Sequence, residues 1–132
     1  MIPGFQSRFV EAICDQDGRN WKLLTPMVYQ SRDGRVFIVP RGASTDGAST
    51  PALVASLLPP TGAYWQSAVL HDSAYQNTLQ VASGFKARLS KDECDLLLKE
   101  AMELSGVDDV TVETIYEGVR LGGQWAFDKD RE

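Results

Sequence analysis

The sequence predicts an α+β domain in which a small antiparallel sheet of three or four strands is followed by three helices. Short apolar runs separated by turn signals fill residues 5–41. Helical patterns run from residue 63 to residue 127, and an irregular segment at 42–62 separates the two parts. Because the strands come first and the helices follow, we expect one domain with segregated elements.

The β part is predicted from apolar runs and from the turns between them. An Asp-Gly pair marks a turn after the first run, and a second Asp-Gly pair marks a hairpin between the third and fourth runs. Pro40 ends the last strand or places it at an edge, because proline cannot donate to a ladder. The predicted strands lie within residues 8–14, 21–24, 28–31 and 35–40.

Residues 42–62 are small, polar and turn-prone, with a short helical turn expected after Pro51. A loop of this length in a compact domain is often functional. The alternative is a surface crossover from the sheet to the helices, and the composition does not choose between them.

Three helices are expected in the second part, at about 63–76, 91–104 and 110–125. Ser90 and Glu93 form a capping box at the start of the second helix. The Gly122-Gly123 pair weakens the end of the third helix, and residues 128–132 are expected to be a frayed charged tail.

Charge and composition exclude several classes of protein. The net charge is −5, with 13 basic and 18 acidic residues and no basic cluster, so a nucleic-acid partner is not expected. The N-terminus lacks the pattern of a signal peptide, and the longest apolar run, 52–58, is too short for a transmembrane segment. The 2 cysteines are interpreted as reduced thiols.

His71 is the single histidine of the chain, and it is the centre of the candidate site. Asp72 follows it directly, and Tyr75 lies one helical turn further on the same face. Asp72 points about 100° away from His71, so the two side chains can serve different partners. This is either a catalytic or metal site, or a core histidine beside a solvated aspartate.

Asp95 lies at the edge of the apolar stripe predicted for the second helix. A carboxylate near a buried face needs a partner, and His71 is the candidate because the first two helices can pack antiparallel. Such a contact would fix the imidazole tautomer and leave the other ring nitrogen free to take a proton. The alternatives are a solvated Asp95 or ion pairs with Lys91 or Lys99.

The irregular loop and the third helix add further candidate binding residues. Asp72 is a candidate Ca²⁺ ligand together with carbonyls of the loop, and the ion would polarise a substrate carbonyl. Asp46 and Ser49 are candidate binding residues, although Asp46 also suits a turn that closes its own loop. Ser49 lies outside any Gly-x-Ser-x-Gly elbow, so nucleophilic catalysis is not indicated. Arg120 can clamp a carboxylate, or it can form a structural salt bridge.

Several motifs occur together in a characteristic order, at Thr45-Asp46-Gly47-Ala48-Ser49, Pro60-x-Gly62, Ala68-Val69-Leu70-His71-Asp72-x-x-Tyr75, Ser90-Lys91-x-x-Cys94-Asp95 and Tyr116-x-x-Val119-Arg120. Over roughly residues 35–123 this order resembles a phage and prophage family known only as a domain of unknown function. Lys91 stands where that family tends to have arginine, and Cys94 where it tends to have alanine. The resemblance implies a phage protein in the host cytoplasm or the virion.

The His-Asp-x-x-Tyr pattern, with an aspartate on the next helix, is similar to the active site of secreted and parvoviral phospholipases A2. The resemblance implies that His71 activates water, that Asp72 binds Ca²⁺, and that Asp95 supports His71 in a network including Tyr75. The disulfides and the glycine-rich calcium loop of the secreted enzymes have no counterpart here.

Two hypotheses from different classes follow from these patterns and resemblances. One is a Ca²⁺-assisted hydrolase acting on an ester such as a phospholipid. The other is a non-catalytic virion (tail) or assembly component that binds other phage structural proteins. A cytoplasmic inhibitor of a host defence is a third possibility, and the sequence does not indicate an oligomeric state.

Overall fold

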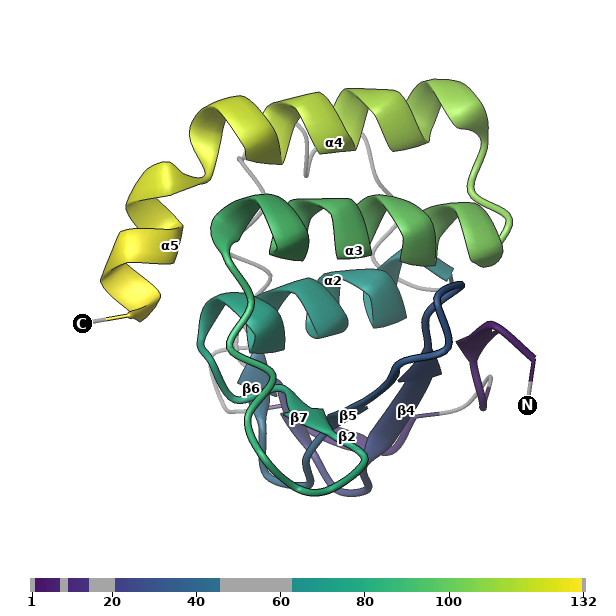
Figure 1. The fold of residues 1–132 in the computed structure, drawn as a ribbon, viewed down its shortest axis with the longest axis vertical. Helices are drawn as coiled ribbons and strands as arrows, with labels where there is room; N and C mark the ends of the chain where they lie inside the picture. The colour runs from purple at the N-terminus through teal and green to yellow at the C-terminus, as the bar shows by residue number, and fades with distance from the viewer. Residues whose placement is uncertain (1, 8–9, 15–20, 46–62, 132) are drawn as a thin grey trace.

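The computed structural model of the chain describes residues 2–7, 10–14, 21–45 and 63–131. Its strands lie on one side and its helices on the other, with α4, α3 and α2 stacked above the strands in Figure 1. The predicted α+β class, with an N-terminal antiparallel sheet followed by helices, is confirmed.

The described strands form two antiparallel sheets. The larger sheet has the order β1-β4-β5-β7, built from β1 (Gly4–Phe5), β4 (Met27–Gln30), β5 (Val36–Val39) and β7 (Gln80–Val81). The smaller sheet has the order β2-β3-β6, built from β2 (Ala12–Cys14), β3 (Trp21–Leu23) and β6 (Ser44–Thr45).

The β4–β5 hairpin is the centre of the larger sheet, as the second Asp-Gly pair predicts. Gly34 takes a φ of 92° in the turn, a conformation that glycine adopts without steric cost. Alternate side chains of the two strands are buried, so one face of the hairpin forms the floor of the core.

Strand β7 was not expected from the sequence, which indicated only a connection between the first two helices. It pairs with β5 through Phe37↔Val81 and Ile38↔Gln80. A strand of 2 residues is too short to show an alternating pattern, so its pairing is decided by the neighbouring edge of the sheet.

The helices are α2 (Ala63–Tyr75), α3 (Lys91–Leu104), α4 (Asp109–Gly122) and α5 (Gln124–Asp130). The first three follow the predicted segments closely, and the Ser90–Glu93 capping box is present at the start of α3. The predicted third helix, however, divides at Gly123, which caps α4 and precedes the short helix α5.

The prediction of a frayed tail at 128–132 is wrong for the described residues, because α5 extends to Asp130 and Arg131 is anchored. Arg131 Nε donates to the carbonyl of Tyr75 at 2.7 Å, and its Nη2 donates to the carbonyl of Leu89 at 2.6 Å. Hydrogen bonds to main-chain carbonyls, which no sequence pattern reports, order this end of the chain.

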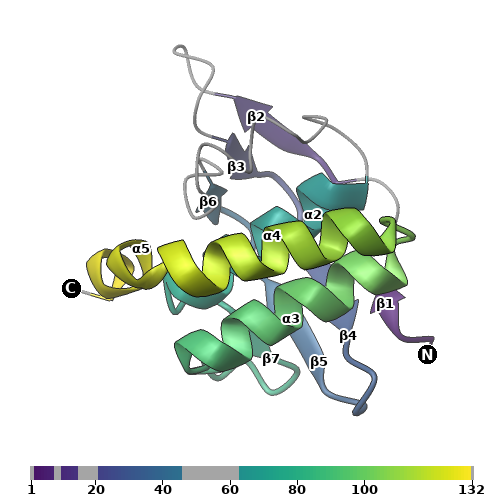
Figure 2. The ribbon, with the colours of Figure 1, turned by 90° about the horizontal axis from the view of Figure 1, so that it is seen from above.

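Helix α2 is the central element of the molecule, and every residue from 67 to 75 is buried. It contacts α3 on one side and strands β5 and β6 on the other, while α4 covers the far side of α3 (Figures 1 and 2). A second apolar cluster, between α3 and α4, contains Leu98, Met102, Val112, Ile115 and Val119. The polar side chains of α2 therefore lie deep inside the protein.

Candidate functional site

His71 on α2 and Asp95 on α3 meet at the interface of the two helices. His71 Nε2 lies 2.8 Å from Asp95 Oδ1, and the two side chains are only 1% and 0% exposed. The contact predicted between the first two helices is therefore confirmed. It joins residues 24 positions apart in the sequence and lies among apolar side chains of the core.

The Asp95 carboxylate accepts hydrogen bonds from several side chains of the site. Tyr75 Oη donates to Oδ1 at 2.6 Å, and Lys91 Nζ donates to Oδ2 at 2.7 Å. Burial raises the pKa of Asp95, but the hydrogen bonds from His71, Lys91 and Tyr75 outweigh it and hold the pKa below its ordinary value. Asp95 is therefore ionised at neutral pH.

The ionised carboxylate decides which ring nitrogen of His71 carries a proton. A carboxylate only accepts hydrogen bonds, so Nε2 must be the donor in this contact. In the neutral imidazole the lone pair is then on Nδ1. The arrangement orients a base whose proton-accepting atom is Nδ1.

Tyr75 supports this network and does not act as a base. Burial, and then the hydrogen bond to Asp95, raise the pKa of Tyr75 well above its ordinary value, so the hydroxyl stays protonated and donates. Its ring lies against His71, with a centroid separation of 4.1 Å. A Cβ atom at Gly123 would lie 2.6 Å from Tyr75 Oη, so the glycine makes room for the hydroxyl.

Lys91 connects this site to the end of α4. Its Nζ donates to the carbonyls of Val119 and Arg120 at 3.1 Å each, in addition to Asp95. Carbonyls near the C-terminal end of a helix attract cations, and the Val119 carbonyl accepts from Lys91 in addition to the Gly123 N–H. From the sequence, His71 and Lys91 were alternative partners of Asp95, and in the structure both bind it, on different carboxylate oxygens.

Gly123 and the capping role of Lys91 were missed by sequence reasoning. The i, i+4 spacing of Lys91 and Asp95 signalled their ion pair, but the α4 carbonyls are visible only once the helices are packed. The Gly122-Gly123 pair signalled a helix end, while the contact with Tyr75 had no sequence signal.

Asp72 is buried, with 2% exposure, and it follows His71 on α2. Ca²⁺ takes about six to eight oxygen ligands. Within the described ranges, no group of three or more His, Cys, Asp or Glu side chains is placed to hold a metal ion. The loop carbonyls considered as further Ca²⁺ ligands, around residues 46–47 and 60–62, lie outside the described residues. The described residues thus supply Asp72 alone from the predicted ligand set and do not complete a Ca²⁺ site.

The other predicted binding residues are not brought to the dyad by the described structure. Asp46 and Ser49 lie outside the described residues. The side chain of Arg120 is exposed, and it is the main-chain carbonyl of this residue that accepts from Lys91.

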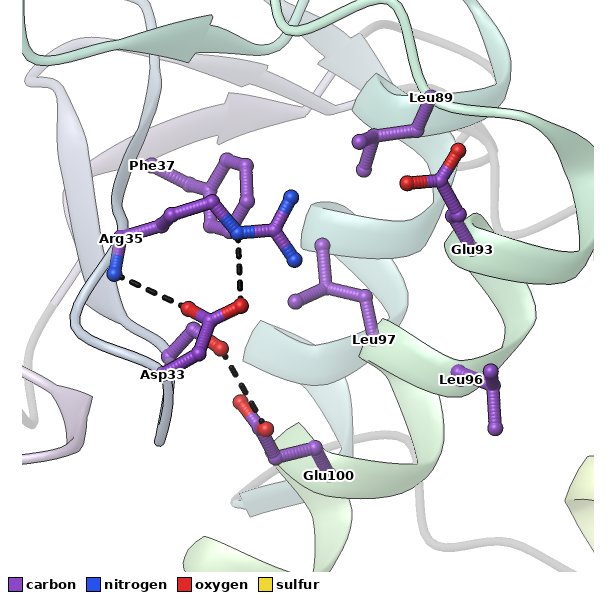
Figure 3. A pocket seen from close by; sticks show the side chains of 9 residues that line it. Asp33, Arg35, Phe37, Leu89, Glu93, Leu96, Leu97 and Glu100 are labelled. Atoms are coloured by element: carbon purple, nitrogen blue, oxygen red, sulfur yellow. Dashed lines mark hydrogen bonds and ion pairs between the residues drawn. The ribbon is translucent and has the colours of Figure 1, made fainter.

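A pocket of about 140 Å³ lies away from this network, between the β4–β5 turn and α3 (Figure 3). Four of its polar side chains form two pairs, and Glu93 accepts from the main-chain amide of Ser90. Arg35 Nε donates to Asp33 Oδ2 at 2.8 Å, and Ser31 Oγ contacts Glu100 Oε2 at 3.4 Å. Phe37 and Leu97 add apolar surface, and none of the residues that line the pocket belongs to the His71 site. The pocket is thus no entrance to the His71–Asp95 pair.

None of the described helices has the length and hydrophobicity that crossing a membrane requires.

Comparison with known proteins places the chain in a family. No curated protein and no solved structure matches the chain. A family model described as "Protein of unknown function (DUF1353)" matches residues 21–119, which contain His71, Tyr75, Lys91 and Asp95. Because the match covers most of the sequence, the chain belongs to the DUF1353 family of proteins of unknown function.

Proposed function

We propose that the protein is a phage-encoded hydrolase in which His71, oriented by Asp95, acts as a general base on an ester substrate such as a phospholipid. One observation carries the proposal: an ionised carboxylate holds Nε2 of His71 and so leaves the lone pair on Nδ1. The phospholipase A2-like pattern of His71, Tyr75 and Asp95 supports the same roles.

The proposed reaction needs no covalent intermediate with the protein. His71 Nδ1 takes a proton from water while the water oxygen attacks the ester carbonyl carbon. The imidazolium then returns that proton to the leaving alkoxide as the ester C–O bond breaks, so a carboxylic acid and an alcohol are formed. General-base assistance of this kind contributes roughly 10²–10⁴-fold in rate.

Asp95, Tyr75 and Lys91 are positioning residues in this scheme. Asp95 holds the imidazole and stabilises the imidazolium, and Tyr75 fixes the shared oxygen Oδ1. The cation at Lys91 offsets part of the Asp95 charge, so the carboxylate stabilises the imidazolium less than an unpaired one would. Ca²⁺ is proposed as an optional cofactor at Asp72, and no step is assigned to it.

The test is hydrolysis of a short-chain fluorogenic ester and of phospholipid vesicles, each with Ca²⁺ and with EDTA. We expect His71→Ala to reduce turnover by at least about 100-fold, as the loss of a general base requires. Cys14→Ser, a partly exposed position on β2, is the matched control and should retain activity. Equal turnover of the wild type and His71→Ala would remove the hydrolase proposal.

The burial of His71 favours a second function, as a non-catalytic virion or assembly component. A side chain with 1% exposure has little access to substrate, and buried polar networks can specify how helices pack. In this case the buried network would fix the register of α2, α3 and α4 through its four side chains, His71, Tyr75, Lys91 and Asp95. Detection of the protein in purified virions at a fixed copy number would support this function, and absence from virions would count against it.

A further inference from the structure

Helix α5 lies beyond the end of α4 (Figures 1 and 2), and it contacts both α4 and α2. Phe127 meets the ring of Tyr75 edge-on, with a centroid separation of 5.3 Å. Arg131 donates to the main-chain carbonyls of Ala74, Tyr75 and Leu89 at 2.6–3.1 Å. The short helix therefore covers both the end of α2 and the segment that leads into α3.

Two fully buried side chains lie close to the contacts that α5 makes. Tyr75 and Cys94 are both 0% exposed, and Tyr75 Oη reaches Asp95 directly. Cys94 Sγ lies 4.0 Å from the Leu89 carbonyl to which Arg131 donates. Burial raises the pKa of the Cys94 thiol to about 12, although the nearby Arg131 guanidinium lowers it, so the buried thiol reacts slowly with thiol reagents.

Helix α5 makes few stabilising contacts with the rest of the protein. It is 7 residues long, none of its residues is buried, and it has no side-chain N-cap hydrogen bond. A helix of this length is not stable by itself in water. Segments with few buried apolar contacts open at a lower free energy than the whole protein unfolds. Gly123 joins α5 to α4, and Arg131 provides its hydrogen bonds to α2 and to Leu89.

We propose that α5 is a strap, latched by Arg131, whose local opening exposes the Tyr75–Asp95 end of the site while the rest of the protein stays folded. The proposal goes beyond the proposed function, since it concerns access to the network and holds whether or not the network is catalytic. In a hydrolase the same opening would control how often the buried dyad is reached.

The single buried thiol of a Cys14→Ser protein measures this opening. In that background Cys94 is the remaining cysteine, and its rate of reaction with a disulfide reagent such as Ellman's reagent reports its exposure. Arg131→Ala removes three hydrogen bonds and should raise the rate by roughly tenfold or more. Lys129→Ala is the matched control, because Lys129 stacks on the exposed Trp125 of the same helix, and its rate should be unchanged.

An unchanged Cys94 rate in Arg131→Ala would overturn the strap, as would an equal increase in Lys129→Ala. A second measurement uses the Cys14→Ser protein without further substitution, so it does not depend on how well Arg131→Ala folds. Local opening predicts that the Cys94 rate hardly changes with urea below the unfolding transition. A rate that instead follows the urea dependence of global unfolding would show that Cys94 is reached only through the unfolded state, and the strap would be rejected.

Discussion

At the scale of single residues, the protein is organised around one carboxylate with three donors. Asp95 is 0% exposed, and a buried carboxylate is tolerated only when it is paired and hydrogen-bonded. His71 and Tyr75 donate to one oxygen, and Lys91 donates to the other. Of these donors, Lys91 is the one that forms an ion pair with Asp95 across its second oxygen, so the stability of the site should depend most strongly on it.

Lys91→Met tests this dependence. Methionine keeps the apolar stem but leaves Asp95 without its cation and removes the ammonium donor from the carbonyls of Val119 and Arg120. Breaking a buried ion pair by removing one partner is strongly destabilising, so we expect a loss of about 3 kcal/mol in the free energy of unfolding, measured in urea. Lys99→Met on the same helix is the control, because Lys99 pairs with the exposed Glu113 and its loss should have little effect. Equal losses in the two variants would contradict the central role of the buried pair.

At the scale of elements, the start of α3 determines where Asp95 lies. Ser90 Oγ accepts from the Glu93 amide, and the Glu93 carboxylate accepts from the Ser90 amide. This capping box begins the helix at Lys91, so Lys91 and Asp95 are one turn apart on the same face. The hydrogen bonds from Ser90 lower the pKa of Glu93, which keeps the capping carboxylate charged.

Ser90→Ala should therefore lower the free energy of unfolding by about 1 kcal/mol, as loss of an N-cap side chain typically does. Urea or thermal unfolding provides the measurement. Ser105→Ala at the other end of α3 is the matched control, since Ser105 caps the helix through its main-chain N–H and this bond survives the substitution. A change of the same size at Ser105 would show that the effect is not one of capping.

At the scale of the whole molecule, polar contacts join the helices to the larger sheet on a second side. Tyr29 Oη donates to Glu100 Oε1 at 2.5 Å, and the main-chain amide of Arg32 donates to the same oxygen. Burial, followed by the hydrogen bond to Glu100, raises the pKa of Tyr29, so its hydroxyl remains a donor. Helix α3 is thus joined to α2 through Asp95, to α4 through Lys91 and to β4 through Glu100.

The stability of the folded protein should depend on pH through Asp95. Its pKa is lower in the folded protein than in the unfolded chain, where a value of about 3.9 is expected. The stabilisation from the charged carboxylate is therefore fully present above the unfolded pKa and is lost as the pH falls through the folded pKa. We expect wild type and Asp95→Asn to differ in unfolding free energy at pH 6, and this difference to begin to shrink once the pH falls below about 4.

Urea unfolding of both proteins from pH 6 to pH 3 measures this difference directly. Subtracting the two curves removes the contributions of Asp33, Glu93 and Asp108, whose pKa values are also lowered but which are common to both proteins. A difference that stays constant over this range would show that the charge of Asp95 does not stabilise the fold.

Several features of the fold and the site were determined by the sequence alone. The β4–β5 hairpin follows from an Asp-Gly turn between apolar runs, and α3 begins where its capping box predicts. Asp95 next to an apolar stripe required a partner, and the helical positions of His71 and Tyr75 made them candidates. These features depend on neighbours within a few residues, or on the cost of burying one charge, and both can be read from local sequence.

The remaining features were decided by tertiary structure, because they depend on atoms that are distant in the chain and carry no side-chain signal. Lys91 and Arg131 donate to main-chain carbonyls. Every residue has a main-chain carbonyl, so the sequence does not indicate which one will accept a hydrogen bond. The helix breaks at Gly123, where a side chain would clash with the hydroxyl of Tyr75, a residue 48 positions earlier in the chain. Strand β7 exists because the edge of β5 accepts it. The sequence thus supplied the candidate partners of Asp95, and the packing of the helices decided that His71, Tyr75 and Lys91 all reach it.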